Sequence, residues 1–268
     1  MELPRLGQGT WNMGDDPARR RGELDALRTG IELGLSLVDT AEMYGDGRSE
    51  SLVGEAIAGQ RDKVFLVSKV LPSNASRKGV SRSCEASLKR LRSDRIDLYL
   101  LHWSSATPLD ETVRGFEDLL AAGKIRSWGV SNLDLAEMTS LLALPGGKAC
   151  ATSQVLYNLA RRGIEFDLLP WLRKHGIPVM AYSPVEQGRL LGNKVLKQVA
   201  QRLGATPAQV ALAWVLRQEG TIAIPKAASA AHVRENRAAL DLQLGVQDLA
   251  ELERSFPAPR GPTPLEMI

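Results

Sequence analysis

The chain has 268 residues, a formal net charge of +3, 44% hydrophobic residues and 24% charged residues. This composition excludes an intrinsically disordered chain, and two cysteines are too few for a disulfide-stapled scaffold. The length suits one α/β barrel of about 250 residues or two smaller domains. No linker or shift in composition divides the chain, so we expect one domain over residues 1–268.

Several classes of partner are also disfavoured. The apolar stretch at 98–101 is far shorter than the roughly 20 residues that cross a bilayer. Residues 1–5 lack the features of a signal peptide, and together with two cysteines that we expect to stay reduced this predicts a cytoplasmic protein. The basic run at 19–21 lacks interleaved aromatic residues and predicts a solvated surface, not a nucleic-acid site. The three histidines and two cysteines are widely separated, so we expect no metal site, and no apolar stripe argues against a monomer.

Short apolar runs alternate with longer amphipathic segments along the chain. The expected strands are 6–10, 36–39, 64–68, 96–102, 125–131, 153–157, 179–182 and 221–224. They are continuous apolar runs, which are typical of parallel strands buried on both faces. The expected helices are 22–33, 49–58, 80–91, 108–122, 135–144, 166–174, one that begins at Thr206-Pro207, and 230–240. Residues 257–268 hold four prolines, which predicts an irregular tail.

Eight alternating strand–helix units favour the α/β class and a (β/α)8 TIM barrel with right-handed crossovers. An open doubly wound sheet shows the same alternation. A dinucleotide-binding sheet of that kind carries G-x-G-x-x-G after an early strand, and Gly7-Gln8-Gly9-Thr10 is not that motif. We therefore predict the barrel.

In such a barrel the active site lies at the carboxyl ends of the strands. The second strand ends at Asp39 with Tyr44 in the next loop, the third ends near Lys69, and the fourth ends near His102. A lysine that follows an apolar strand needs a counter-charge, and Asp39 is the nearest candidate. A lysine beside a phenol lowers the phenol's pKa from about 10, which predicts that Tyr44 protonates a carbonyl oxygen while a neutral His102 orients it.

Each of these four residues also has an ordinary structural explanation. An aspartate at a strand end caps helices, a loop tyrosine packs, a rim lysine is solvated, and a strand histidine is satisfied within the core. The convergence of all four on one rim favours the functional interpretation.

Three groups of motifs make the chain resemble the aldo-keto reductase superfamily over nearly its whole length. They are LSLVDTAEMYG at 35–45, then VSK at 67–69 with SLKRL at 87–91 and IDLYLLHW at 96–103, and finally GKIR at 123–126 with WGVSN at 128–132. Members of this superfamily are NAD(P)H-dependent carbonyl reductases on a (β/α)8 barrel. The resemblance implies a catalytic tetrad of Asp39, Tyr44, Lys69 and His102, with Tyr44 as the general acid.

The resemblance also implies how the cofactor and the substrate are bound. Amide and hydroxyl side chains would contact the nicotinamide carboxamide, Tyr182 would stack on the ring, and Lys226 would meet the 2′-phosphate of NADPH. The expected cofactor set is Thr10, Trp11, Asp39, Ser131, Asn132, Gln154, Tyr182, Ser183, Pro184, Gly188, Arg189, Lys226, His232, Glu235 and Asn236. The expected substrate set is Trp11, Tyr44, His102 and Trp103.

The chain departs from the superfamily pattern at a few places. His232 stands where many NADPH-specific relatives carry arginine, so NADPH is expected on the strength of Lys226, with NADH as the alternative. The N-terminal hairpin, the loop at 104–109 and the C-terminal tail are all short, which predicts an open mouth.

This pattern is most similar to bacterial members that reduce small reactive carbonyls, methylglyoxal in particular. One alternative is a cofactor-binding regulatory module without significant turnover. Another is a phosphate-dependent barrel enzyme, but the chain has no glycine-rich phosphate loop after the seventh or eighth strand.

Overall fold

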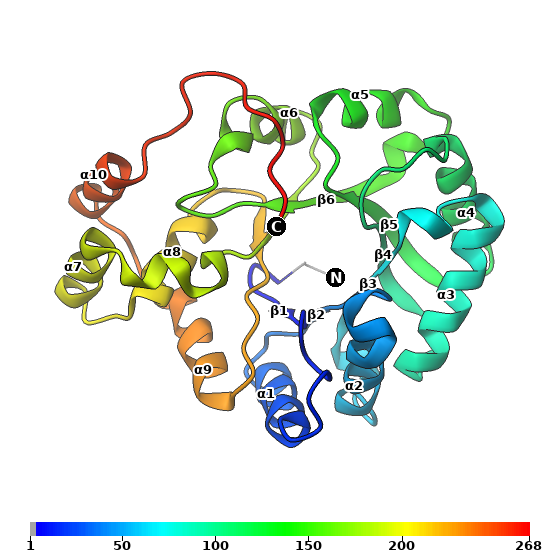
Figure 1. Ribbon diagram of the computed structural model, residues 1–268, viewed down its shortest axis with the longest axis horizontal. Helices are drawn as coiled ribbons and strands as arrows, with labels where there is room; N and C mark the ends of the chain where they lie inside the picture. Colours follow the sequence, from blue (N-terminus) through cyan, green and yellow to red (C-terminus); the bar gives the residue numbers. More distant parts are fainter. Residues whose placement is uncertain (1–3) are drawn as a thin grey trace.

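The computed structural model describes residues 4–268. Eight parallel strands form the centre of the molecule, and the helices surround them (Figure 1). Neighbouring strands follow the order of the chain, and each lies where the sequence predicts one. The strands are β1 (Gln8–Gly9), β2 (Leu37–Asp39), β3 (Phe65–Val70), β4 (Ile96–Leu101), β5 (Ile125–Ser131), β6 (Cys150–Leu156), β7 (Val179–Tyr182) and β8 (Thr221–Ala223).

The sheet closes on itself between its last and first strands. Leu6 forms a parallel bridge with Ala223, and Gly9 forms one with Lys226. A Cβ atom at Gly9 would lie 2.8 Å from the Ile224 carbonyl oxygen, so this close approach requires glycine. The predicted (β/α)8 barrel is confirmed.

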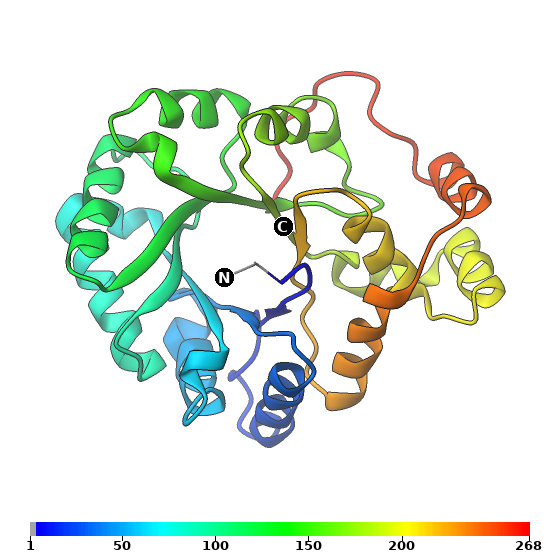
Figure 2. The same cartoon turned by 180° about the vertical axis from the view of Figure 1, so that it is seen from behind.

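The helices form an outer ring that Figure 2 shows from behind. They are α1 (Arg20–Glu32), α2 (Arg48–Ala56), α3 (Arg77–Leu91), α4 (Leu109–Ala121), α5 (Leu135–Ala143), α6 (Leu168–Lys174), α7 (Lys194–Arg202), α8 (Pro207–Leu216), α9 (Ala230–Ala238) and α10 (Val246–Ser255). The sequence did not predict α7 and α10, because each is a second helix beside the one that the β–α repeat requires. Within residues 4–268, no helix is both long and apolar enough to cross a membrane.

Apolar side chains pack on both sides of the barrel wall. The larger core lies between the strands and the helices, where Phe116 of α4 stacks on Trp128 of β5 with ring centroids 5.3 Å apart. A smaller cluster consists of Leu37, Val67, Leu98, Leu100, Met180, Ile222 and Ile224, all on strands or directly after them. This second cluster fills the barrel interior and forms the apolar floor of the site described below.

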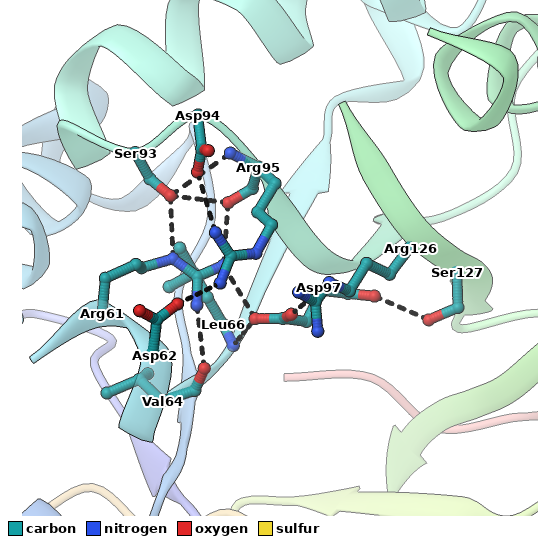
Figure 3. A network of polar contacts seen from close by, with 10 residues as sticks. All are labelled: Arg61, Asp62, Val64, Leu66, Ser93, Asp94, Arg95, Asp97, Arg126 and Ser127. Carbon is teal, nitrogen blue, oxygen red and sulfur yellow. Dashed lines mark hydrogen bonds and ion pairs between the residues drawn. The ribbon is translucent and has the colours of Figure 1, made fainter. Parts of the chain in front are cut away.

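A polar network joins three strands near their amino ends (Figure 3). The Asp97 carboxylate on β4 accepts hydrogen bonds from Arg61, at 2.8 Å, and from the backbone N–H of Leu66, at 2.9 Å. Arg126 of β5 approaches the other carboxylate oxygen at 3.4 Å. Because the amino ends of barrel strands lie opposite the active-site end, we assign this network to stability.

The structure of the two chain ends tests two predictions, a short N-terminal hairpin and an irregular C-terminal tail. Between residue 4 and β1 the structure has one isolated bridge, at Leu6, and no strand pair that would form a hairpin. Residues 257–268 contain no helix or strand, as predicted. This C-terminal segment, red in Figure 1, runs from α10 back toward the middle of the ring.

Candidate active site

The strand register directs two charged side chains into the barrel interior. Asp39 pairs with Val67 on the neighbouring strand, and Lys69 pairs with Leu100. Paired residues on adjacent strands point to the same face of a sheet. Val67 and Leu100 belong to the interior cluster, so Asp39 and Lys69 also face inward, at the carboxyl ends of β2 and β3.

Lys69 is fully buried and all of its donors are used. Its Nζ donates to Asp39 Oδ2 at 2.7 Å, to the Thr40 carbonyl at 2.8 Å and to Tyr44 Oη at 3.2 Å. Burial lowers the pKa of Lys69, but Asp39 and Tyr44 outweigh this effect, and the pKa lies above its ordinary value. The predicted ion pair with Asp39 is therefore present, and Lys69 is a permanent cation beside the phenol oxygen.

Lys69 lowers the pKa of Tyr44, as predicted, but the expected net lowering of that pKa is wrong. Burial raises the pKa of Tyr44, Lys69 lowers it and Asp39 raises it, and the net pKa lies above the ordinary value of 10.0. The sequence predicted the neighbouring charge but not the loss of water around the phenol. Tyr44 consequently keeps its proton at neutral pH.

The loop that carries Tyr44 is held in place by a glutamate that the sequence did not single out. Glu42 accepts hydrogen bonds from the backbone N–H of Leu71, at 2.6 Å, and from the Asn74 side chain, at 3.1 Å, which ties the loop to the end of β3. Directly after Tyr44 the chain turns left-handed, with φ of 57° at Gly45. Glycine adopts this conformation without a steric penalty.

His102 lies directly after β4 and faces Tyr44, with ring centroids 5.8 Å apart. Burial, and then the nearby Lys69 charge, lower the pKa of His102 to about 3. Its Nδ1 is buried and has no hydrogen-bond partner among the described residues. The imidazole is therefore neutral at physiological pH, as the sequence predicted.

A cleft of about 700 Å³ opens above these residues at the carboxyl ends of the strands. Its lining includes every predicted site residue except Lys69 and Arg189, that is, Thr10, Trp11, Asp39, Tyr44, His102, Trp103, Ser131, Asn132, Gln154, Tyr182, Ser183, Pro184, Gly188, Lys226, His232, Glu235 and Asn236. The sequence did not predict the other lining residues, which are Gly9, Asn12, Met43, Val185, Gln187, Leu191, Ala208, Ile224, Pro225, Met267 and Ile268. Most of the unpredicted residues are next to a predicted one in the sequence. Extending each predicted site by one residue on either side would have found them.

Lys69 does not line the cleft itself, but it contacts Asp39 and Tyr44, which do. The Arg189 guanidinium pairs with Glu186 at 3.0 Å and does not line the cleft, and its expected contact with the pyrophosphate stays a prediction. The C-terminal segment, which was expected to leave the mouth open, brings Met267 and Ile268 to the cleft, where both side chains stay exposed.

Two amide side chains line the cleft, one from β6 and one from the residue directly after β5. Gln154 donates to Asp39 Oδ1 at 2.8 Å, while Asn132 donates to the His102 carbonyl at 3.1 Å. Tyr182 donates from its hydroxyl to Asn132 Oδ1 at 3.0 Å. Asn132 has a φ of 56°, a left-handed conformation that asparagine tolerates better than most residues.

This set of donors fits nicotinamide adenine dinucleotide phosphate. Amides both donate and accept hydrogen bonds, as the recognition of a carboxamide requires. Lys226 supplies a cation and His232 a ring donor for a phosphate, and both line the same cleft. The volume of the cleft lies within the range of small-molecule and cofactor sites.

Comparison with known proteins agrees with this geometry. Residues 5–255 match the sequence profile of the aldo/keto reductase family. The chain belongs to this family. The aldo/keto reductase is 55% identical to methylglyoxal reductase YeaE of Escherichia coli K12, over all of this chain and 96% of that protein. It is 32% identical to the NADH-specific methylglyoxal reductase of the same strain, over 92% of each chain.

Solved structures lead to the same family. An aldo/keto reductase from Klebsiella pneumoniae in complex with NADP and acetate has a TM-score of 0.98 and 52% identity, and the match covers 99% of this chain and 96% of that one. A second structure from that organism, in complex with NADPH, has the same TM-score and identity and is covered to 95%. The aldo/keto reductase described here is an NADP-dependent oxidoreductase that acts on carbonyl compounds.

Proposed function

We propose that this aldo/keto reductase reduces methylglyoxal and similar small carbonyl compounds with NADPH, and that Tyr44 is its general acid. The observation that carries the proposal is the contact between the Tyr44 hydroxyl and the buried Lys69 cation, at 3.2 Å, in the wall of the cleft. The identity to methylglyoxal reductase YeaE supports the choice of substrate.

When bound, the nicotinamide cofactor supplies the hydride that reduces the carbonyl carbon. The side chains of this protein would hold it through the donor set described above. Asn132, Ser131 and Gln154 would bind the carboxamide, and Tyr182 would lie against the ring. The remaining contacts would come from Ser183, Pro184 and Gly188 to the pyrophosphate, Lys226 and His232 to the 2′-phosphate, and Glu235 and Asn236 to the adenine.

Tyr44 would give its proton to the carbonyl oxygen. As the proton leaves, negative charge develops on the phenol oxygen, and the Lys69 ammonium already donates a hydrogen bond to that oxygen. In a site with little water this fixed cation stabilises the developing charge more strongly than solvent does. Asp39 keeps Lys69 protonated, and the neutral His102 can donate a ring N–H to the carbonyl oxygen.

The mouth of the cleft suits a small carbonyl compound with an apolar end. Trp11, Met43, Met267 and Ile268 are exposed apolar side chains that line the cleft, beside Trp103. A panel of aldehydes, α-ketoaldehydes and diketo sugars, assayed with NADPH, tests the choice of substrate. The proposal for methylglyoxal fails if its kcat/KM is far below those of the other compounds.

The pH dependence of reduction tests the assignment of the acid. We expect kcat/KM to stay level from about pH 6 to about pH 9 and to fall only above the ordinary tyrosine pKa of about 10. The acid must carry its proton, and the net rise in the pKa of Tyr44 moves the loss of that proton to higher pH. His102, with a pKa of about 3, adds no inflection near neutrality. An inflection between about pH 6 and about pH 7 would point to a histidine as the acid.

The cofactor preference is tested at His232. We expect His232→Arg to lower the Kd for NADPH by about two- to fivefold, because a guanidinium pairs with a 2′-phosphate more strongly than an imidazole does at an exposed position. NADH lacks this phosphate, so its Kd should not change. Fluorescence titration with both cofactors makes the comparison, and equal effects on the two would place His232 away from the phosphate.

We also infer a cytoplasmic, monomeric enzyme. Cys84 and Cys150 are buried, and burial raises the pKa of each thiol to about 12, which supports two thiols that stay reduced. Sedimentation of the purified protein tests the monomer.

A further inference from the structure

Two adjacent arginines form ion pairs just before the C-terminal segment, residues 257–268, and near its end. Arg162 pairs at 2.7 Å with Glu253 on α10, just before the segment begins. Arg161 pairs at 2.6 Å with Glu266, near the end of the segment. The second pair lies directly before Met267 and Ile268, the two residues that the segment contributes to the cleft.

Arg161 also contacts a second segment that lines the cleft. Its Nε donates at 3.1 Å to Glu186, in the loop at 183–193 that follows β7. Glu186 is buried and accepts further hydrogen bonds from Asn158, at 2.7 Å, and from Arg189, at 3.0 Å. Burial raises the pKa of Glu186, but these hydrogen bonds outweigh it and leave the pKa below its ordinary value. Glu186 is therefore a charged anchor within the loop.

The loop needs such an anchor because its backbone is strained. Ser183, Glu186 and Gln187 have φ values of 47°, 51° and 54°, a left-handed conformation that is uncommon for residues other than glycine. Conformations of this kind persist only where the surrounding contacts hold them. The same loop lines the cleft with Ser183 and Gly188, which we assign to the cofactor.

We propose that Arg161 is a positioning residue that couples two parts of the cleft. One is the cofactor loop, residues 183–193, and the other is the substrate wall, which Met267 and Ile268 form. Through Glu186 it holds the loop, and through Glu266 it holds Met267 and Ile268 at the cleft. Because one guanidinium serves both carboxylates, an ordered loop favours an ordered wall, and the reverse follows by linkage. The inference rests on the proposed function, because it takes the substrate that contacts Met267 and Ile268 to be a carbonyl compound.

Steady-state kinetics provide the first test. We expect Glu266→Gln to raise KM for phenylglyoxal, which carries a larger apolar group than methylglyoxal, by about two- to fivefold. The kcat should not change, and the Kd for NADPH should rise by less than in Arg161→Gln, because Glu186 keeps its own partners and only the link to the wall is lost. Arg161→Gln should raise both KM and the Kd for NADPH, and adding Glu266→Gln to it should raise KM no further. The matched control is Glu85→Gln. Glu85 lies on α3, and this variant removes its exposed ion pair with Lys124, away from the cleft.

Hydrogen exchange in residues 257–268 provides a readout that is independent of turnover. We expect saturating NADPH to slow exchange there in the parent protein and in Glu85→Gln, but not in Arg161→Gln or Glu266→Gln. Equal protection in all four proteins, or an unchanged KM in Glu266→Gln, would overturn the coupling. Glu266→Gln leaves the loop contacts intact and keeps the test decisive if Arg161→Gln folds poorly. A parent protein without carbonyl turnover would refute the proposed function, and the exchange comparison alone would then decide the coupling.

Discussion

In the Tyr44→Phe protein, kcat for carbonyl reduction falls by about 10²- to 10⁴-fold, the usual contribution of a general acid. Only the hydroxyl is lost, and the ring keeps its packing beside His102, with centroids 5.8 Å apart in the parent. We therefore expect the Kd for NADPH to stay within about twofold of the parent value. Steady-state kinetics together with a fluorescence titration of NADPH measure the two effects separately.

Tyr99→Phe is the matched control for this experiment. Tyr99 lies on β4, is fully buried and does not line the cleft, so the loss of its hydroxyl should leave kcat unchanged. Activity of Tyr44→Phe within a few-fold of the parent would mean that another group donates the proton. Equal losses in the two variants would indicate a general effect on folding.

The second large effect is expected at Lys69. Lys69→Met removes the cation and leaves the buried Asp39 carboxylate with the Gln154 amide, at 2.8 Å, as its side-chain partner. An uncompensated buried charge of this kind typically costs about 3–5 kcal/mol of unfolding free energy. Turnover should fall as well, because no cation stabilises the charge that develops on the Tyr44 oxygen. Urea unfolding and steady-state kinetics measure the two losses.

A double variant separates the contribution of Lys69 to stability from its contribution to catalysis. Lys69→Met combined with Asp39→Asn removes both charges, so the buried carboxylate no longer needs a partner. We expect this variant to regain most of the stability and none of the activity. If it is as unstable as Lys69→Met alone, the loss comes from packing around the lysine stem and not from the unpaired charge.

The barrel and the convergence of the tetrad were predictable because both depend on local signals. Continuous apolar runs mark the buried strands, and strand ends in a barrel share one rim. Asp39 and Lys69 lie at the ends of two such runs, and the structure joins them at 2.7 Å. The match between sequence and structure is therefore closest where a residue's role follows from its place on a strand.

The contacts of the C-terminal segment were not predictable in this way. Arg161 and Glu266 are separated by 105 positions, and neither lies in a periodic pattern that would indicate its partner. The prolines between α10 and the cleft remove the helical or strand periodicity by which a segment can be placed. The pKa of Tyr44 was misjudged for a related reason, because burial is a property of the whole fold and not of neighbouring residues.

The most direct test of the reductase assignment is the consumption of NADPH in the presence of methylglyoxal, run beside NADH at the same concentration. The geometry around Tyr44 predicts saturable turnover with NADPH that the Tyr44→Phe protein largely loses. Saturable binding of NADPH without turnover of methylglyoxal or of any compound in the carbonyl panel would contradict it, and would favour a cofactor-binding regulatory module.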